Sequence, residues 1–277
     1  MVGARIVAAS SESRLPPQST VGSRASALAA VQQGVSTCEL CPRLRAHCQR
    51  IAREKKAAHR AETYWGRPVP GFGDPDARLL IVGLAPAAHG ANRTGRVFTG
   101  DGSGDFLMRA LHDNGFASIP TARHARDGLS LRDAYILSVV RCAPPDNKPT
   151  RDEISRCRVH LRAELSALPR IRIVVALGRI AWDGTLALAR ERHPELELAR
   201  PARAGGPGRP QRPPARPRFA HGALVAPGEP GAPVLLGSYH PSRQNTNTGR
   251  LTPPMLSAVF AQARRFLIED EHANGLA

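Results

Sequence analysis

The sequence predicts an α/β fold, a three-layer α/β/α sandwich around a central, mostly parallel four-stranded sheet. Two observations predict it. Four short runs are rich in valine, isoleucine and leucine along their whole length, which is typical of strands covered on both faces. Helical patterns lie between these runs, and this alternation favours a doubly wound sheet. The expected strands are Leu79–Gly83, Tyr135–Val140, Ile171–Gly178 and Val234–Tyr239.

Each expected helix has its own signal. Apolar residues in the stretch from Phe106 to Leu111 form one stripe on a helical wheel. Thr150 and Glu153 have the spacing of a capping box, so a helix is expected to begin there. A helical stretch is also expected over Arg43–Lys56. The later helices are expected over about 151–167, over 179–192 and from about 254 onward.

Composition narrows the class of protein. The chain has 277 residues and a formal net charge of +16, which favours a polyanionic partner, most simply nucleic acid. The alternative explanation of the same charge is a compositional bias toward arginine, without such a partner. No run of eighteen or more apolar residues and no secretory h-region is present, so we expect no membrane association. Five cysteines, an odd count, favour a cytoplasmic protein (nucleoid-associated in a bacterium) with metal or redox cysteines.

The chain is expected to form one domain. Residues 1–30 lack periodicity and are interpreted as a mobile leader, and residues 31–277 as a single domain. A proline- and arginine-rich segment at about 200–219 interrupts the pattern and is interpreted as a disordered surface insertion. Two interpretations of it stay open, a basic arm that follows phosphates and a solvated insert without a role.

Four cysteines have spacings that suit a metal centre. Cys38 and Cys41 form a C-x2-C pair, and Cys142 and Cys157 form a wider second pair. Four thiolates can hold zinc or an iron–sulfur cluster, and the wide second pair favours [4Fe–4S] over zinc. Unrelated buried thiols are the alternative. The fifth, Cys48, is interpreted as a small buried hydrophobe.

Polar residues gather in three loops that follow predicted strands. The carboxyl ends of parallel strands open on one edge, so these loops are expected to meet in one crevice. Taken singly, each residue has a structural explanation, as Asp101 does as the N-cap of the next helix. The converging residues are His89, Asn92, Arg93, Asp101, Asn147, Lys148, His240, Arg243 and Asn245, with Phe98 as an aromatic among them.

These loops carry a family resemblance. The motifs are Gly83–Ala87, His89–Gly95, Phe98–Asp101, Arg141–Pro145 with Asn147–Pro149, and His240–Ser242. In this order they resemble the uracil-DNA glycosylase superfamily, and within it the iron–sulfur-containing family 5, the B-type enzymes. The resemblance covers roughly Cys38 to Leu267.

The resemblance implies an activity and a cofactor. It implies a monofunctional glycosylase that hydrolyses the N-glycosidic bond of a deaminated base in DNA, and a [4Fe–4S] cluster on Cys38, Cys41, Cys142 and Cys157. Ala85 stands where many relatives keep a polar residue for the attacking water, so Asp101 and Asn147 become the candidates for that role. Ser138 stands where related iron–sulfur enzymes read uracil with an asparagine. This departure fits the broader tolerance of the B-type group, which accepts hypoxanthine and xanthine.

The remaining roles follow from the chemistry of the reaction. A flipped base is expected to stack on Phe98, while backbone groups near Ala85 and Ser138 read its edge. His240 is expected to donate to the base carbonyl as negative charge grows there. The flanking phosphates are expected to bind Arg93, Arg96 and Arg243. The partner is then DNA containing deaminated bases, bound by a monomer.

Two other functions compete with this interpretation. A non-catalytic iron–sulfur DNA-binding protein would share the colour and the salt-sensitive DNA binding. A zinc-dependent nucleobase deaminase would need a His/Cys-x-Glu element before a downstream C-x2-C, and the chain lacks that order.

Overall fold

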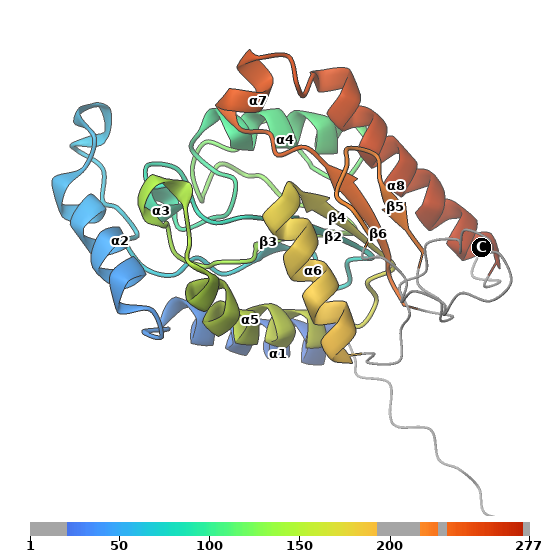
Figure 1. Cartoon of the computed structure of the whole chain (residues 1–277), viewed down its shortest axis with the longest axis horizontal. Helices are drawn as coiled ribbons and strands as arrows, with labels where there is room; N and C mark the ends of the chain where they lie inside the picture. Colours follow the sequence, from blue (N-terminus) through green and yellow to red (C-terminus); the bar gives the residue numbers. More distant parts are fainter. Residues whose placement is uncertain (1–20, 193–216, 227–231, 274–277) are drawn as a thin grey trace, which may run out of the picture.

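The computed structural model describes residues 21–192, 217–226 and 232–273 (Figure 1). In this part of the chain, six strands form one sheet in the order β1-β3-β2-β4-β6-β5. The four inner strands are parallel to one another and are the four that the sequence predicts. Every residue in them is buried, which explains their continuous apolar runs. They are β2 (Leu79–Gly83), β3 (Ala134–Ser138), β4 (Ile173–Leu177) and β6 (Val234–Ser238).

The two edge strands correct the prediction of a four-stranded sheet. β1 (Phe72–Gly73) pairs antiparallel with β3, and β5 (Leu224–Val225) pairs antiparallel with β6. Each has only two residues, too few to show an alternating pattern in the sequence. The sheet is therefore mixed, with a parallel centre.

Helices cover both faces of the sheet, which confirms the three layers. Along β2, Leu79 and Ile81 pack into one core, while Leu80 and Val82 pack into the other. The first core is closed by α4 and α8, and the second by α1, α2, α5 and α6 (Figure 1). The bounds are α1 (Val21–Ser36), α2 (Pro42–Glu54), α4 (Gly102–Asp113), α5 (Arg151–Ser166), α6 (Arg179–Arg192) and α8 (Pro253–Ala273).

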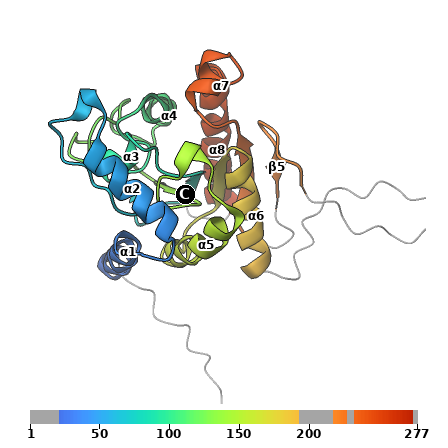
Figure 2. The same cartoon turned by 60° about the vertical axis from the view of Figure 1, so that its left-hand side comes forward.

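Short elements lie in the connections between strands and helices. α3 lies beside α2 at one end of the molecule (Figure 2). α7 follows β6 and precedes α8. The bounds are η1 (Ala57–His59), α3 (Ala91–Thr94), η2 (Pro145–Asn147) and α7 (Arg243–Asn247).

Helix α1 corrects the predicted mobile leader for residues 21–30 only. The helix begins at Val21, and its Leu28 is 4% exposed and packs into the core that also holds Leu80. This helix has a single charged residue, so its sequence shows no clear polar face from which a helical period could be predicted. Residues 1–20 lie outside the described residues.

The predicted capping box of α5 is confirmed. The Thr150 hydroxyl accepts a hydrogen bond from the Glu153 amide at 3.2 Å, and the Glu153 carboxylate accepts one from the Thr150 amide at 2.8 Å. The predicted insertion at about 200–219 falls mostly outside the described residues. No helix within the described ranges is long and apolar enough to cross a membrane.

Candidate active site

The carboxyl ends of β2 and β3 meet under an aromatic ring. Gly83 ends β2 and stands in register with Ser138, the last residue of β3. A methyl group on Gly83 would lie 2.7 Å from the Phe98 ring, so the glycine makes room for that ring. Phe98 has a φ of 47°, a left-handed backbone that turns its chain back toward the sheet. Three residues that are far apart in the sequence therefore form one floor.

His240 completes this floor from the end of β6. Its ring lies 5.7 Å from the ring of Phe98, tilted by 32°. Burial lowers the pKa of His240 to about 4, so the imidazole is neutral at neutral pH and carries one N–H donor. Among the described residues, none forms a hydrogen bond with this ring. The donor is therefore free for a ligand.

Asp101 both caps α4 and lines a cavity. Its carboxylate accepts a hydrogen bond from the Gly104 amide at 3.0 Å. Burial raises the pKa of Asp101, while the amides of Gly104 and Ser103 and the charge of Arg243 act in the opposite direction. The influence of Arg243 places α7 within electrostatic reach of this carboxylate. The capping role and a functional role are thus compatible.

Gly90 leaves room for the Asp101 carboxylate. A Cβ on Gly90 would lie only 2.1 Å from one carboxylate oxygen of Asp101. No side chain larger than hydrogen fits between the two. The loop before α3 and the first turn of α4 are therefore in direct contact at the candidate acid.

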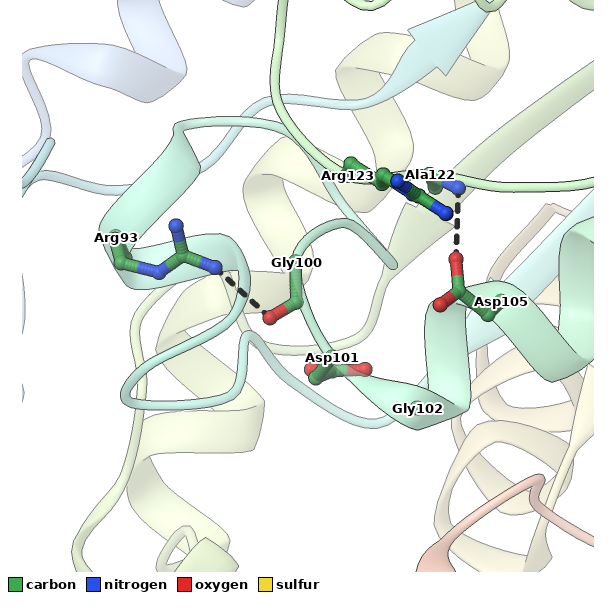
Figure 3. A pocket seen from close by; sticks show the side chains of 7 residues that line it. All are labelled: Arg93, Gly100, Asp101, Gly102, Asp105, Ala122 and Arg123. Atoms are coloured by element: carbon green, nitrogen blue, oxygen red, sulfur yellow. Dashed lines mark hydrogen bonds between the residues drawn. The ribbon is translucent and has the colours of Figure 1, made fainter. Parts of the chain in front are cut away.

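A cavity of about 300 Å³ opens beside this carboxylate (Figure 3). Asp101 stands at one rim and Arg123 at another, with Gly100 between them in this view. Two hydrogen bonds fix its walls, one from Arg93 to the Gly100 carbonyl at 2.9 Å and one from the Ala122 amide to Asp105 at 3.0 Å. The lining residues are Arg93, Gly100, Asp101, Gly102, Asp105, Ala122 and Arg123.

The predicted phosphate ligands Arg93 and Arg96 are buried and already paired with carboxylates. Arg93 is 7% exposed and forms an ion pair with Glu62, besides its bonds to backbone carbonyls. Arg96 is 6% exposed and makes two hydrogen bonds to the Asp127 carboxylate, at 2.8 and 2.9 Å. Both guanidinium groups are thus already paired with groups of the protein itself.

The other predicted residues differ in their placement. Asn147 is exposed in η2 with a φ of 56°, and no contact with Asp101 is found among the described residues. Arg243 is exposed on α7. Ala85 is half-buried against the core on the α5 side of the sheet. The structure thus brings Phe98, Ser138 and His240 together and places Asp101 within electrostatic reach of Arg243, while the role of Asn147 stays a prediction.

The cysteines lie on three segments that pack together. Cys38 follows α1, Cys41 precedes α2, Cys142 follows β3, and Cys157 lies in α5. Burial raises the pKa of Cys157 to about 11, and the charges of Cys38 and Cys41 act in the same direction. The Arg141 amide donates to the Cys157 sulfur at 3.3 Å. The four thiols therefore share one electrostatic neighbourhood.

The arrangement of these cysteines does not by itself identify a metal site. In the described part of the chain, no three His, Cys, Asp or Glu side chains are grouped so that they could hold a metal ion. The predicted [4Fe–4S] centre therefore stays a prediction. Cys48 is fully buried, as expected, and its thiol donates to the Ala143 carbonyl at 3.6 Å and lies within hydrogen-bonding reach of Cys142.

A comparison with family models decides the class of this site. Residues 70–264 match the model of the uracil DNA glycosylase superfamily. The match takes in the four inner strands, the loop that carries Asp101 and the segment that carries His240. The chain belongs to the uracil-DNA glycosylase superfamily. The family resemblance of its loops is thereby confirmed.

The glycosylase is similar to several type-5 uracil-DNA glycosylases. It is 46% identical to one from Thermus thermophilus over 236 residues, which cover 84% of this chain and 95% of the relative. It is 47% identical to one from Mycobacterium tuberculosis over 233 residues, 83% of this chain and 78% of the relative. One from Pyrobaculum aerophilum is 42% identical over 226 residues, 82% of this chain and 87% of the relative.

These relatives establish an enzyme, a DNA glycosylase that hydrolyses an N-glycosidic bond. This activity excludes the two competing interpretations, a non-catalytic DNA-binding protein and a deaminase. Sequence reasoning missed two carboxylates, Glu62 and Asp127, which form ion pairs with Arg93 and Arg96. Each stands 31 residues from its arginine, and the sequence carries no signal that would pair them.

Proposed function

We propose that this glycosylase excises uracil and also other deaminated bases, such as hypoxanthine and xanthine, from DNA. Membership in the family already implies removal of uracil in DNA repair. The observation that carries the broader range is the site floor, where the Phe98–His240 ring pair lies beside the short side chain of Ser138. A ring platform accepts the face of any base, and short side chains impose no pattern on its edge.

The first step is to bring the base to this floor. A base inside a duplex is out of reach, so the nucleotide must flip out of the stack. Phe98 then stacks on one face of the base. Backbone groups near Ala85 and Ser138 contact its edge, and Arg243 on α7 contacts a flanking phosphate.

Bond cleavage separates two charges, and the site has a group for each. Negative charge grows on the leaving base, and the neutral imidazole N–H of His240 donates to its carbonyl oxygen. Positive charge grows on the sugar, and the carboxylate of Asp101 offsets it while orienting the attacking water. Asn147, which is exposed on its loop, is assigned a supporting contact to that water in the DNA complex.

We assign a [4Fe–4S] cluster to Cys38, Cys41, Cys142 and Cys157. The donor set fits, since four thiols come from three packed segments and a backbone amide already points at one sulfur. When bound, the cluster would supply no chemistry to a hydrolysis. The cysteines instead would fasten the loop after β3 to the start of α2.

A panel of lesions tests the proposal. Duplexes carrying a single uracil, hypoxanthine or xanthine should each give an alkali-labile site when incubated with excess protein, and an unmodified duplex should give none. Cleavage of uracil alone would overturn the broad range. Cleavage of none of the three would overturn the proposed function itself.

A further inference from the structure

The loop of residues 121–128 lies at the rim of the cavity beside Asp101. Hydrogen bonds to Gly100 and to the first turn of α4 hold it there. Ala122 and Arg123 belong to the lining of the cavity (Figure 3). The Gly100 amide donates to the Ala122 carbonyl at 2.7 Å, which joins this loop to the residue before Asp101. The Ala122 amide donates to Asp105 in the first turn of α4 at 3.0 Å.

The base of the loop is anchored in the core. Ala117 and Leu131 form an antiparallel bridge, and both are 7% exposed. Phe116 is fully buried, and its carbonyl accepts the Arg132 amide at 2.9 Å. The segment thus leaves and re-enters the core at fixed points.

Asp127 organises the tip of the loop. Its carboxylate accepts hydrogen bonds from the amides of Arg123 at 2.8 Å, His124 at 3.3 Å and Leu129 at 3.1 Å. It also receives the two bonds from Arg96, whose Nε donates to Thr99 at 2.9 Å. Arg96 therefore connects the site loop to the 121–128 loop.

Two arginine side chains of this loop take no part in holding it in place. Arg123 and Arg126 are exposed, and neither guanidinium has a hydrogen-bond or ion-pair partner among the described residues. The one carboxylate of the loop is neutralised by Arg96. A pre-ordered loop with one free arginine in the lining of the cavity and a second one three residues further along suits a row of phosphates, since arginine binds phosphate oxygens in a fixed planar geometry.

We propose that the 121–128 loop holds the DNA backbone beside the flipped nucleotide, with Arg123 and Arg126 on successive phosphates. Arg96 and Asp127 position the loop without touching DNA. The inference rests on the proposed function only in that the substrate is DNA. It replaces Arg93 and Arg96 as phosphate ligands with two residues that the family resemblance did not point to.

The test measures how binding depends on salt. The protein binds a fluorescently labelled duplex without uracil at several KCl concentrations, and the slope of log affinity against log salt counts phosphate contacts. In the double variant Arg123→Ala/Arg126→Ala, we expect this slope to fall by about 1.8 and the affinity to fall on the order of tenfold. Arg123→Lys/Arg126→Lys should keep most of the slope, because it keeps both charges.

The control removes two arginines at the opposite edge of the sheet. Arg132 and Arg170 are exposed and precede the amino ends of β3 and β4. Arg132→Ala/Arg170→Ala should leave the slope unchanged. An unchanged slope in the loop variant, or an equal fall in the control, would overturn the inference. Excision of uracil, measured separately, tests the proposed function, so either idea can fail without the other.

Discussion

At the residue scale, the site depends on two glycines that leave space for other side chains. Gly83 admits the Phe98 ring over the end of β2, and Gly90 admits the Asp101 carboxylate. Neither contact is visible in the sequence, because a glycine in a loop is usually explained by backbone freedom. Gly90 is needed here for its lack of volume and also for its backbone, because a φ of −98° with a ψ of −105° lies outside the regions that residues with a side chain prefer.

Gly90→Ala should move Asp101 and leave the fold intact. The added methyl group would lie 2.1 Å from the carboxylate oxygen, so the side chain must give up its present position. We expect a fall in the single-turnover rate of uracil excision by roughly 100-fold, the scale of a lost general-base or charge-stabilising contact. DNA affinity should change little.

Gly102→Ala is the matched control for this change. Gly102 also lines the cavity beside Asp101, yet a Cβ there meets nothing within 4 Å. The control should keep the wild-type rate. Equal rates for the two variants would show that the contact with Gly90 does not position the acid.

At the element scale, α5 links the capping box to the cysteines. Glu153 closes the box with Thr150 and also receives two hydrogen bonds from Arg43 of α2, at 2.7 and 2.8 Å. α5 carries Cys157, and Cys41 stands at the start of α2. The two helices that hold predicted ligands are therefore joined at their N-termini by one carboxylate.

Thr150→Ala should weaken this junction. Loss of the cap costs about 1 kcal/mol, which corresponds to a fall of roughly 2–4 °C in the melting temperature of a chain of this size. Thr150→Ser keeps the hydroxyl and should melt like the wild type. Differential scanning calorimetry of the three proteins checks this, and an unchanged melting temperature in the alanine variant would contradict a stabilising role for the cap.

At the scale of the whole molecule, the sequence predicts the layers well and the polar network poorly. The inner strands are predictable because burial on both faces leaves an unbroken apolar run, and the predicted strand Leu79–Gly83 matches β2 residue for residue. Phe98 and His240 are predictable as neighbours because the ends of parallel strands share an edge, whereas Ser138 is predicted only through the family resemblance.

The partners of the arginines were not predictable. A charge count of +16 does not tell which cations are already neutralised, and Arg96 is paired with Asp127 across a separate loop. The two-residue edge strands and the start of α1 escaped prediction for a related reason, since each depends on tertiary contacts rather than on a local pattern. The succession of strands and helices along the chain can thus be inferred from local sequence patterns, whereas the pairing of charged side chains depends on the tertiary structure.

The most direct test of the central claim is the rate of uracil excision by Asp101→Asn. Asparagine caps a helix about as well as aspartate, so α4 should keep its start while the site loses its negative charge. Under single-turnover conditions, we predict a rate about 100-fold or more below the wild type, with unchanged DNA affinity and melting temperature. A rate equal to that of the wild type would show that Asp101 is only a helix cap.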